Sequence, residues 1–140
     1  MQRNDCVFCR IVAGKLPAHK VYEDGKYLAF LSIDPKTRGH TLLIPKEHHR
    51  WVWEVPEFGE YWETARKVGL ACKEAMGAEA ISFVTMGFEM PHAHIWIVPR
   101  KAGDGHGTSL DFSLTVPMTE AEFAETARKI RQTLFSGGGE

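Results

Sequence analysis

The 140-residue sequence lacks the features that mark several large classes of protein. It has no excess of basic residues, because 17 lysines and arginines stand against 18 aspartates and glutamates. Capture of a nucleic acid or of an anionic membrane requires a basic patch or stripe, which this balance does not favour. No stretch approaches the roughly 18 consecutive apolar residues of a membrane span. The sequence therefore predicts a protein with no nucleic acid and no membrane as a partner.

Cysteines are also scarce, and their number is odd, because the chain has three. An odd count argues against a closed framework of disulfides, and residues 1–10 lack the apolar segment of a secretory signal. We therefore expect a reducing, cytoplasmic setting. In that setting the pair Cys6 and Cys9 is better suited to metal binding or redox chemistry than to a disulfide.

The chain contains no internal repeat and no low-complexity block, and 44% of its residues are hydrophobic. That content is sufficient for one domain with a core of its own. We place this single domain at residues 1–134 and a flexible C-terminal tail at residues 135–140. Within the domain, residues 101–107 are rich in glycine and polar residues, which predicts a loop.

Short β-prone runs and two amphipathic segments predict an α+β fold. Five runs are typical of strands, at residues 21–23, 27–31, 41–44, 81–85 and 94–98. A long helix is predicted over residues 58–76, ending at Gly77, with an apolar stripe made of Phe58, Trp62, Ala65, Gly69, Cys72 and Met76. Thr119 and Glu122 form a capping box that opens a second helix, which we expect to be shorter and peripheral. The order of elements predicts an antiparallel sheet with helices on one side.

The segment around residues 92–98 carries the most informative pattern. Alternate side chains of a strand point to the same face, so His92, His94 and Trp96 share one face. The other face, with Ala93 and Ile95, is then the core face. Two interpretations of the histidine pair stay open on this pattern alone, namely a solvated polar face of an edge strand and a weak metal site.

The cysteine pair bears on that choice. Two thiolates three residues apart can hold a tetrahedral zinc, which then needs two further ligands. The candidates are His40, His48, His49, His92 and His94. Two alternatives stay open, namely a redox pair, which would favour a strand end opening a helix, and two unligated cysteines of the core.

Several motifs together resemble the histidine-triad (HIT) family, and in particular its Hint-like bacterial branch. The resemblance runs from Asp5 to about Leu134, and the matching segments occur in family order at residues 6–18, 21–25, 28–35, 38–48 and 92–100. It implies a HIT fold, that is, a five-stranded antiparallel sheet with one long helix and a shorter C-terminal helix. It also implies a homodimer formed mainly through the long helix and a neighbouring strand.

The resemblance further implies a set of site residues. A structural Zn²⁺ is expected on Cys6, Cys9, His48 and His92. His94, the middle histidine of the triad, is the expected nucleophile, and it would form a nucleotidyl-histidine intermediate that water then hydrolyses. The expected nucleotide-binding residues are Phe8, Ile11, Phe30, Ser32, Ile33 and Trp96, of which Phe8, Ile11, Phe30 and Ile33 would form the base pocket.

Three departures from the family pattern affect catalysis. Trp96 stands where the third histidine is expected, and an indole N–H cannot shuttle a proton at neutral pH. Ser32 stands where a ribose-binding acid is expected, and Asp34, two residues on, is not expected to replace it. Residues 86–91 form a shorter loop than the usual phosphate-binding stretch.

The sequence therefore predicts a HIT-type nucleotide hydrolase or transferase. Its substrates would be nucleoside phosphoramidates or dinucleoside polyphosphates, with a purine nucleotide or nucleotide conjugate as the bound partner. The alternative is a zinc-stabilised, catalytically weak or inactive nucleotide-binding dimer, and a purely structural role with a decayed site is a third hypothesis.

Overall fold

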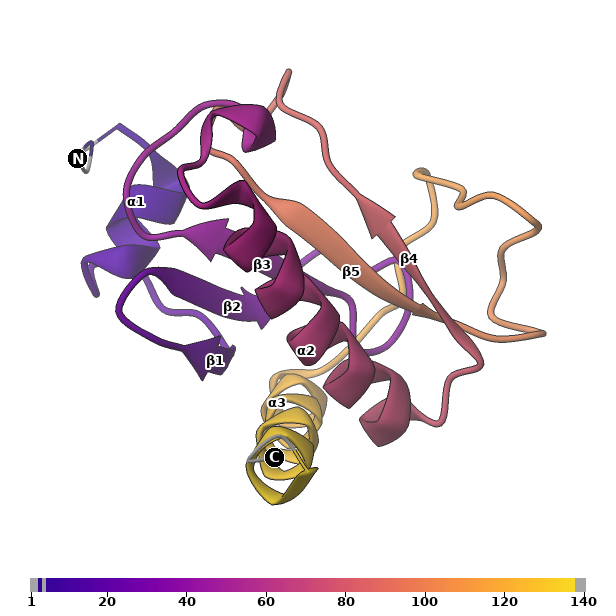
Figure 1. The fold of residues 1–140 in the computed structure, drawn as a ribbon. Helices are drawn as coiled ribbons and strands as arrows, with labels where there is room; N and C mark the ends of the chain where they lie inside the picture. Colours follow the sequence, from indigo (N-terminus) through magenta and orange to yellow (C-terminus); the bar gives the residue numbers. More distant parts are fainter. Residues whose placement is uncertain (1–2, 4, 138–140) are drawn as a thin grey trace.

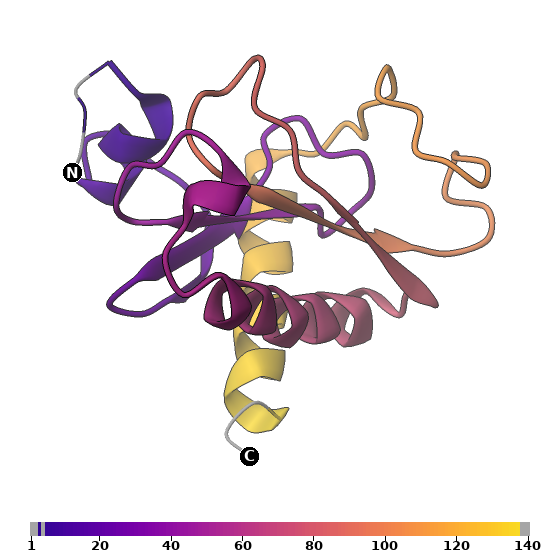
Figure 2. The same ribbon diagram turned by 45° about the horizontal axis from the view of Figure 1, so that its top comes forward.

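The computed structural model describes residue 3 and residues 5–137, with three layers visible in Figures 1 and 2. The elements in chain order are α1 (Val7–Val12), β1 (Lys20–Glu23), β2 (Tyr27–Leu31), β3 (Thr41–Pro45), the short 3₁₀ helix η1 (Val52–Glu54), α2 (Phe58–Met76), β4 (Ala80–Val84), β5 (Ile95–Arg100) and α3 (Glu120–Gly137). The predicted α+β class is confirmed. No helix of the described part of the chain is both long enough and apolar enough to cross a membrane.

The five strands form one sheet in the order β1-β2-β3-β5-β4, and every neighbouring pair is antiparallel. The β1–β2 hairpin turns where the carboxylate of Asp24 accepts hydrogen bonds of 2.8 Å from the backbone N–H groups of Lys26 and Tyr27. β5 lies between β3 and β4, and the histidine segment leads directly into its first residue, Ile95. The predicted five-stranded antiparallel sheet is thus confirmed.

Helix α2 has the predicted bounds, and Gly77 ends it in the left-handed conformation with φ of 64°. The predicted apolar stripe included Phe58, and this position is wrong. Phe58 is 47% exposed, whereas Tyr61 is fully buried. Tyr61 takes the core position because its hydroxyl donates to the carbonyl of Leu43 at 2.8 Å, so its polar tip is not left unpaired.

Helix α3 begins at the predicted capping box, in which Thr119 and Glu122 exchange side-chain and backbone hydrogen bonds. It has 18 residues against 19 in α2, so it is shorter by only one residue. It is not peripheral, because Ala127 and Ile130 are buried in the core with α2. It continues through residue 137, so the expected boundary at residue 134 falls inside the helix, while residues 138–140 of the expected tail lie outside the described residues.

The sheet is covered on both faces, which corrects the expectation of helices on one side only. Figure 2 shows α2 beneath the sheet, with α1 and the connecting loops above it. Ala93 and Ile95 point into the α2 core, as predicted. The upper face carries a second apolar cluster, in which Phe8 and Ile11 of α1 pack against β2 and β3. Both faces of β2 and β3 are therefore buried, as their continuous apolar sequences allow.

Candidate functional site

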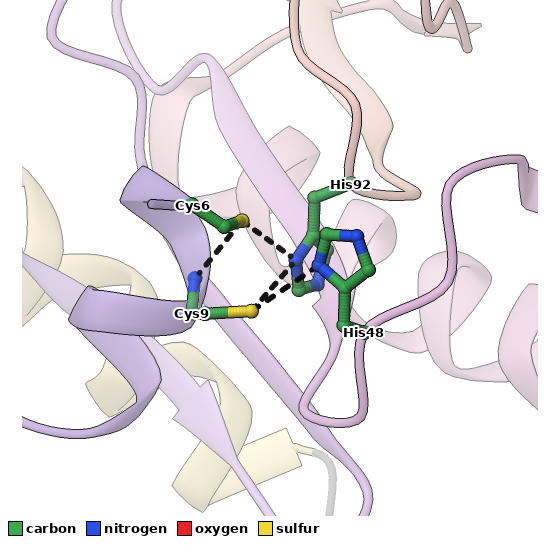
Figure 3. Close-up of side chains that lie close together, drawn as sticks. All are labelled: Cys6, Cys9, His48 and His92. Atoms are coloured by element: carbon green, nitrogen blue, oxygen red, sulfur yellow. Dashed lines mark hydrogen bonds between the residues drawn. The ribbon is translucent and has the colours of Figure 1, made fainter. Parts of the chain in front are cut away.

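Four side chains from three parts of the chain meet above the sheet at the N-terminus of α1 (Figure 3). Cys6 is the N-cap of α1 and Cys9 lies one turn further on, where Cys9 N–H donates to the Cys6 sulfur at 3.3 Å. His48 follows β3, and His92 precedes β5. The ligand atoms of the four residues all lie within 4.8 Å of one another. The structure therefore brings together the four residues expected to bind metal.

The distances within this cluster fit a tetrahedral zinc. Nδ1 of His92 lies 3.2 Å from the Cys6 sulfur and 3.6 Å from the Cys9 sulfur, and Nδ1 of His48 lies 3.2 Å from the Cys9 sulfur. Zinc bonds of about 2.3 Å to sulfur and about 2.0 Å to nitrogen place tetrahedral ligand atoms about 3.3–3.8 Å apart. The two thiols and two imidazoles are also the donor types that structural zinc sites use.

Hydrogen bonding selects the tautomer that His92 would need as a ligand. Its Nε2–H donates to the carbonyl of Pro45 at 2.9 Å, so the lone pair on Nδ1 faces the two sulfurs. Burial lowers the pKa of His92 to about 4, which keeps the ring neutral at neutral pH. A metal-bound histidine commonly donates its second ring N–H to a backbone carbonyl or a carboxylate in this way.

The thiols of the cluster would lose protons on binding a metal. Burial raises the pKa of the Cys9 thiol, so the metal-free protein holds that thiol protonated at neutral pH. A bound cation would displace the proton, which makes metal affinity fall as the pH falls. The third cysteine, Cys72, is buried in α2 and contacts Thr41 at 3.4 Å, apart from this cluster.

His94 lies beside the metal cluster and is 4% exposed. Its Nδ1–H donates to the carbonyl of His92 at 2.8 Å, so the neutral ring carries its lone pair on Nε2. The backbone carbonyl of His94 accepts a hydrogen bond of 2.7 Å from the hydroxyl of Thr85. Burial lowers the pKa of His94, against the opposing effect of the His92 carbonyl. These contacts leave a fixed, unprotonated Nε2 that can act as a nucleophile or base.

The apolar surface next to His94 contains three of the four residues expected in the base pocket. Phe8, Ile11 and Phe30 are buried in one cluster, and the rings of Phe8 and Phe30 meet edge to face with centroids 5.5 Å apart. Phe8 also lies 6.0 Å from the His94 ring. Ile33 is not part of this buried cluster, because it lies beyond the end of β2 and is 89% exposed.

Ser32 is almost buried at the end of β2, and its hydroxyl oxygen accepts a hydrogen bond of 3.1 Å from the N–H of Asp34. The carboxylate of Asp34 pairs with the buried Lys36 at 3.1 Å and with the hydroxyl of Thr115. Asp34 is thus held by partners of its own and is not a free replacement for a ribose-binding acid. The hydroxyl proton of Ser32 remains able to donate to a ligand.

Trp96 lies in the same upper cluster, where it contacts His40, a candidate metal ligand that the structure leaves outside the metal cluster. The ring of His40 is 4.7 Å from Trp96 and fully buried. Its Nδ1 accepts from the N–H of Lys36 at 3.0 Å, and burial lowers its pKa to about 3, so its proton is on Nε2. That Nε2 has no hydrogen-bond partner among the described residues.

The loop of residues 86–91 is fixed at the rim of the site. The guanidinium of Arg50 donates to the carbonyl of Gly87 at 3.1 Å and lies over the Trp51 ring. A Cβ on Gly87 would lie 2.5 Å from that ring, so this close packing requires glycine. Glu89 is exposed at the tip of the loop.

Comparison with known proteins gives a consistent result. The HIT domain family matches residues 13–103. An uncharacterised HIT-like protein of Methanocaldococcus jannaschii is 38% identical over 107 residues, which are 71% of this chain and 82% of that protein. The crystal structure of a zinc-bound histidine triad family protein from Mycobacterium smegmatis superimposes with a TM-score of 0.78 at 31% identity, and the match covers 94% of each chain.

Two further relatives carry names that state an activity. An adenylylsulfatase of Arabidopsis thaliana is 34% identical over 109 residues, which are 73% of this chain and 55% of that protein. An adenosine 5′-monophosphoramidase of Saccharomyces cerevisiae is 28% identical over 101 residues, which are 69% of this chain and 63% of that protein.

Proposed function

Since the chain belongs to the HIT domain family, we propose that it is a nucleotidyl hydrolase or transferase in which His94 is the nucleophile. The substrates would be nucleoside phosphoramidates or dinucleoside polyphosphates, as the sequence predicts. One observation carries the proposal, namely the hydrogen bond from His94 Nδ1–H to the His92 carbonyl, which leaves Nε2 unprotonated. Relatives named as an adenylylsulfatase and a monophosphoramidase support it.

In the proposed reaction, Nε2 of His94 attacks the α-phosphorus. A nitrogen–phosphorus bond forms, the bond from phosphorus to the leaving group breaks, and the leaving group takes the electron pair. Water then attacks the nucleotidyl-histidine, the nitrogen–phosphorus bond breaks, and a nucleoside monophosphate and a proton are released. The His92 carbonyl stabilises the positively charged ring during the first step, because it holds the Nδ1 proton throughout.

The base of a purine nucleotide or nucleotide conjugate would pack against Phe8, Ile11 and Phe30. Aromatic and aliphatic side chains of this kind are typical of small-molecule pockets. Ser32 would donate one hydrogen bond to the ribose, and Trp96 would border the phosphate. Ile33, which is exposed beyond β2, would contribute to the base pocket from the solvent side.

A structural Zn²⁺ on Cys6, Cys9, His48 and His92 is part of the proposal. The fit of the four donors and the zinc-bound relative support it. A closed set of four protein ligands leaves no position for substrate, so the metal would tie α1 to the start of β5. The reduced cysteines suit the expected cytoplasmic setting.

A homodimer through α2 and β4 is also proposed. β4 is an edge strand, and exposed apolar side chains lie on both elements, with Leu70 55% and Phe83 39% exposed. We expect sedimentation analysis to give the mass of two chains, and Leu70→Glu to give the mass of one, because a buried charge in such an interface is unfavourable. A monomeric wild type would contradict this part of the proposal.

The position of Trp96 predicts a dependence on the leaving group. Trp96→His is expected to raise kcat/KM about 10- to 100-fold for a phosphoramidate with a strongly basic amine, since a histidine there can donate a proton. A substrate with an acidic leaving group should respond little. Trp96→Phe is the control, and an equal effect of Trp96→His on both substrates would contradict the assignment.

A nucleotide-binding dimer with little or no turnover is the second candidate, favoured by Trp96 and Ser32 in place of the expected groups. The two candidates differ in a direct assay. In one measurement, a fluorogenic adenosine phosphoramidate is mixed with the wild type and release of the leaving group is followed. In a second measurement, binding of AMP to the wild type is measured by titration. Turnover supports the enzyme, whereas saturable AMP binding without turnover supports the binding protein.

A further inference from the structure

Helix α1 carries part of the metal cluster and part of the base pocket at the same time. Phe8, which lines the pocket, lies in the sequence between the two cysteines of the cluster. We infer that Cys6 and Cys9 are positioning residues for the nucleotide pocket. A metal bound to them fixes Phe8 and thereby raises the affinity for the nucleotide. The inference rests on the proposed function, because it couples the metal site to the nucleotide site of that proposal.

Helix α1 depends on the rest of the chain for its position. It has six residues, and isolated helices shorter than about 12–15 residues are marginal in water. Among the residues that the structure describes, the hydrogen bonds that join α1 or Cys6 to segments beyond residue 16 are those of the two sulfurs with His48 and His92. The packing of Phe8 and Ile11 on β2 and β3 is the second attachment.

The strength of the first attachment depends on a metal. Sulfur is a weak hydrogen-bonding partner, so the contacts of 3.2 Å and 3.6 Å between the two sulfurs and His92 Nδ1 restrain α1 only loosely. A closed site of four ligands would hold the same atoms by coordination bonds. Because Cys6 and Cys9 flank Phe8, fixing both sulfurs also fixes the backbone of Phe8. Figure 3 shows the two sulfurs directed from α1 toward histidines of other segments.

The Phe8 ring lies where a shift of α1 would change the base pocket. Its centroid is 5.5 Å from the Phe30 ring, 5.7 Å from the His92 ring and 6.0 Å from the His94 ring. Phe8 therefore stands between a metal ligand, the proposed nucleophile and the other aromatic wall of the pocket. A pocket whose walls are fixed before the ligand arrives binds it more tightly, because binding then orders fewer groups.

The nucleophile is anchored without α1. His94 Nδ1–H donates to the His92 carbonyl at 2.8 Å, and the His94 carbonyl accepts from the hydroxyl of Thr85 at 2.7 Å. The His92 ring donates to the carbonyl of Pro45 at 2.9 Å. None of these three bonds involves α1. Removal of the metal should therefore raise KM and leave kcat nearly unchanged, whereas a general loss of structure would lower kcat as well.

The test compares the AMP affinity of the zinc-loaded wild type with that of the same protein after a chelator has removed the zinc. We expect the Kd of AMP to be about tenfold higher without zinc, with an unchanged far-ultraviolet circular dichroism spectrum. Coupling between two binding sites is reciprocal. Saturating AMP should therefore raise the zinc affinity by the same factor in competition with a chromophoric chelator. For a fluorogenic adenosine phosphoramidate, KM should rise and kcat should stay within about twofold.

Phe8→Ala tests the route of the coupling. It leaves the four metal ligands in place, so it should hold about one zinc per chain. It should bind AMP about as weakly as the zinc-free wild type, and removal of zinc should change its AMP affinity by less than about twofold. Phe8→Leu keeps an apolar side chain without a flat ring, and it is the second variant if Phe8→Ala does not retain zinc. Its coupling should fall between those of Phe8→Ala and the wild type.

Phe135→Ala is the matched control, because Phe135 is 90% exposed on α3, below the sheet in Figure 2, whereas α1 lies above it. It should keep the wild-type coupling. Equal AMP affinity with and without zinc, full coupling in the Phe8 variant, lost coupling in Phe135→Ala, or unfolding on zinc removal would each overturn the inference while His94-dependent turnover persists. A protein that holds no zinc, or that binds no AMP in either state, would instead contradict the proposed function, and the coupling with it.

Discussion

His94→Ala is expected to reduce turnover of a fluorogenic adenosine phosphoramidate by at least about 10³-fold, because it removes the atom that would bond to phosphorus. No other side chain can replace it from the same place. His92 directs its free nitrogen at two cysteines, and Trp96 has no basic nitrogen. A single-turnover assay on the variant and the wild type, side by side, measures the effect.

Two controls separate loss of chemistry from loss of structure. His19→Ala removes another histidine, which pairs with Glu120 and stacks on Phe123 away from the site, and it should retain turnover. His94→Ala should retain saturable AMP binding, because Phe8 and Phe30 still line the pocket. Wild-type turnover in His94→Ala would show that another group performs the chemistry.

Loss of the metal is expected to have the largest effect on stability. Purified protein should contain about one zinc per chain, and Cys9→Ser should lower the zinc content and the free energy of unfolding by at least about 3 kcal/mol. Cys9 is the informative position because its sulfur approaches both histidines, His92 and His48. The measurements are elemental analysis and denaturant unfolding, with and without a chelator.

Cys72→Ala is the matched control for that experiment. It removes the third buried cysteine, which lies in α2 and contacts Thr41 rather than the cluster. Zinc content should stay at one per chain, and chelator should destabilise this variant as much as the wild type. A zinc-free wild type whose unfolding is indifferent to chelator would contradict the metal site.

Local patterns predicted the five strands and the two long helices, but not the short helices α1 and η1. Helix α2 has the predicted bounds because apolar periodicity and Gly77 are both encoded within one short segment. The capping box at Thr119 predicted the start of α3 for the same reason. The sequence could not show that Tyr61 rather than Phe58 faces the core, since that depends on the Leu43 carbonyl of a distant strand.

The parts of the candidate site that consist of motif residues could be predicted from the sequence, and the other parts could not. The four metal-binding candidates come together as the resemblance implied. The contact of Trp96 with Phe112 was not predictable, because Phe112 lies in a segment without periodicity whose path is set by Lys36 and Arg100. Ile33 matches the family pattern, but a sequence motif does not specify burial, and Ile33 is 89% exposed beyond β2.

The central claim is that a nucleotidyl group passes through His94, and trapping that intermediate tests it most directly. Wild-type protein is mixed with less than one equivalent of adenosine phosphoramidate, and the reaction is quenched within one turnover. The protein is then digested, and the masses of its peptides are measured by mass spectrometry. The account predicts that the peptide containing residues 92–100 gains one adenylyl group on His94, and that the gain is absent from His94→Ala. AMP formed by the wild type at full rate, with no adduct on that peptide at any quench time, would contradict it.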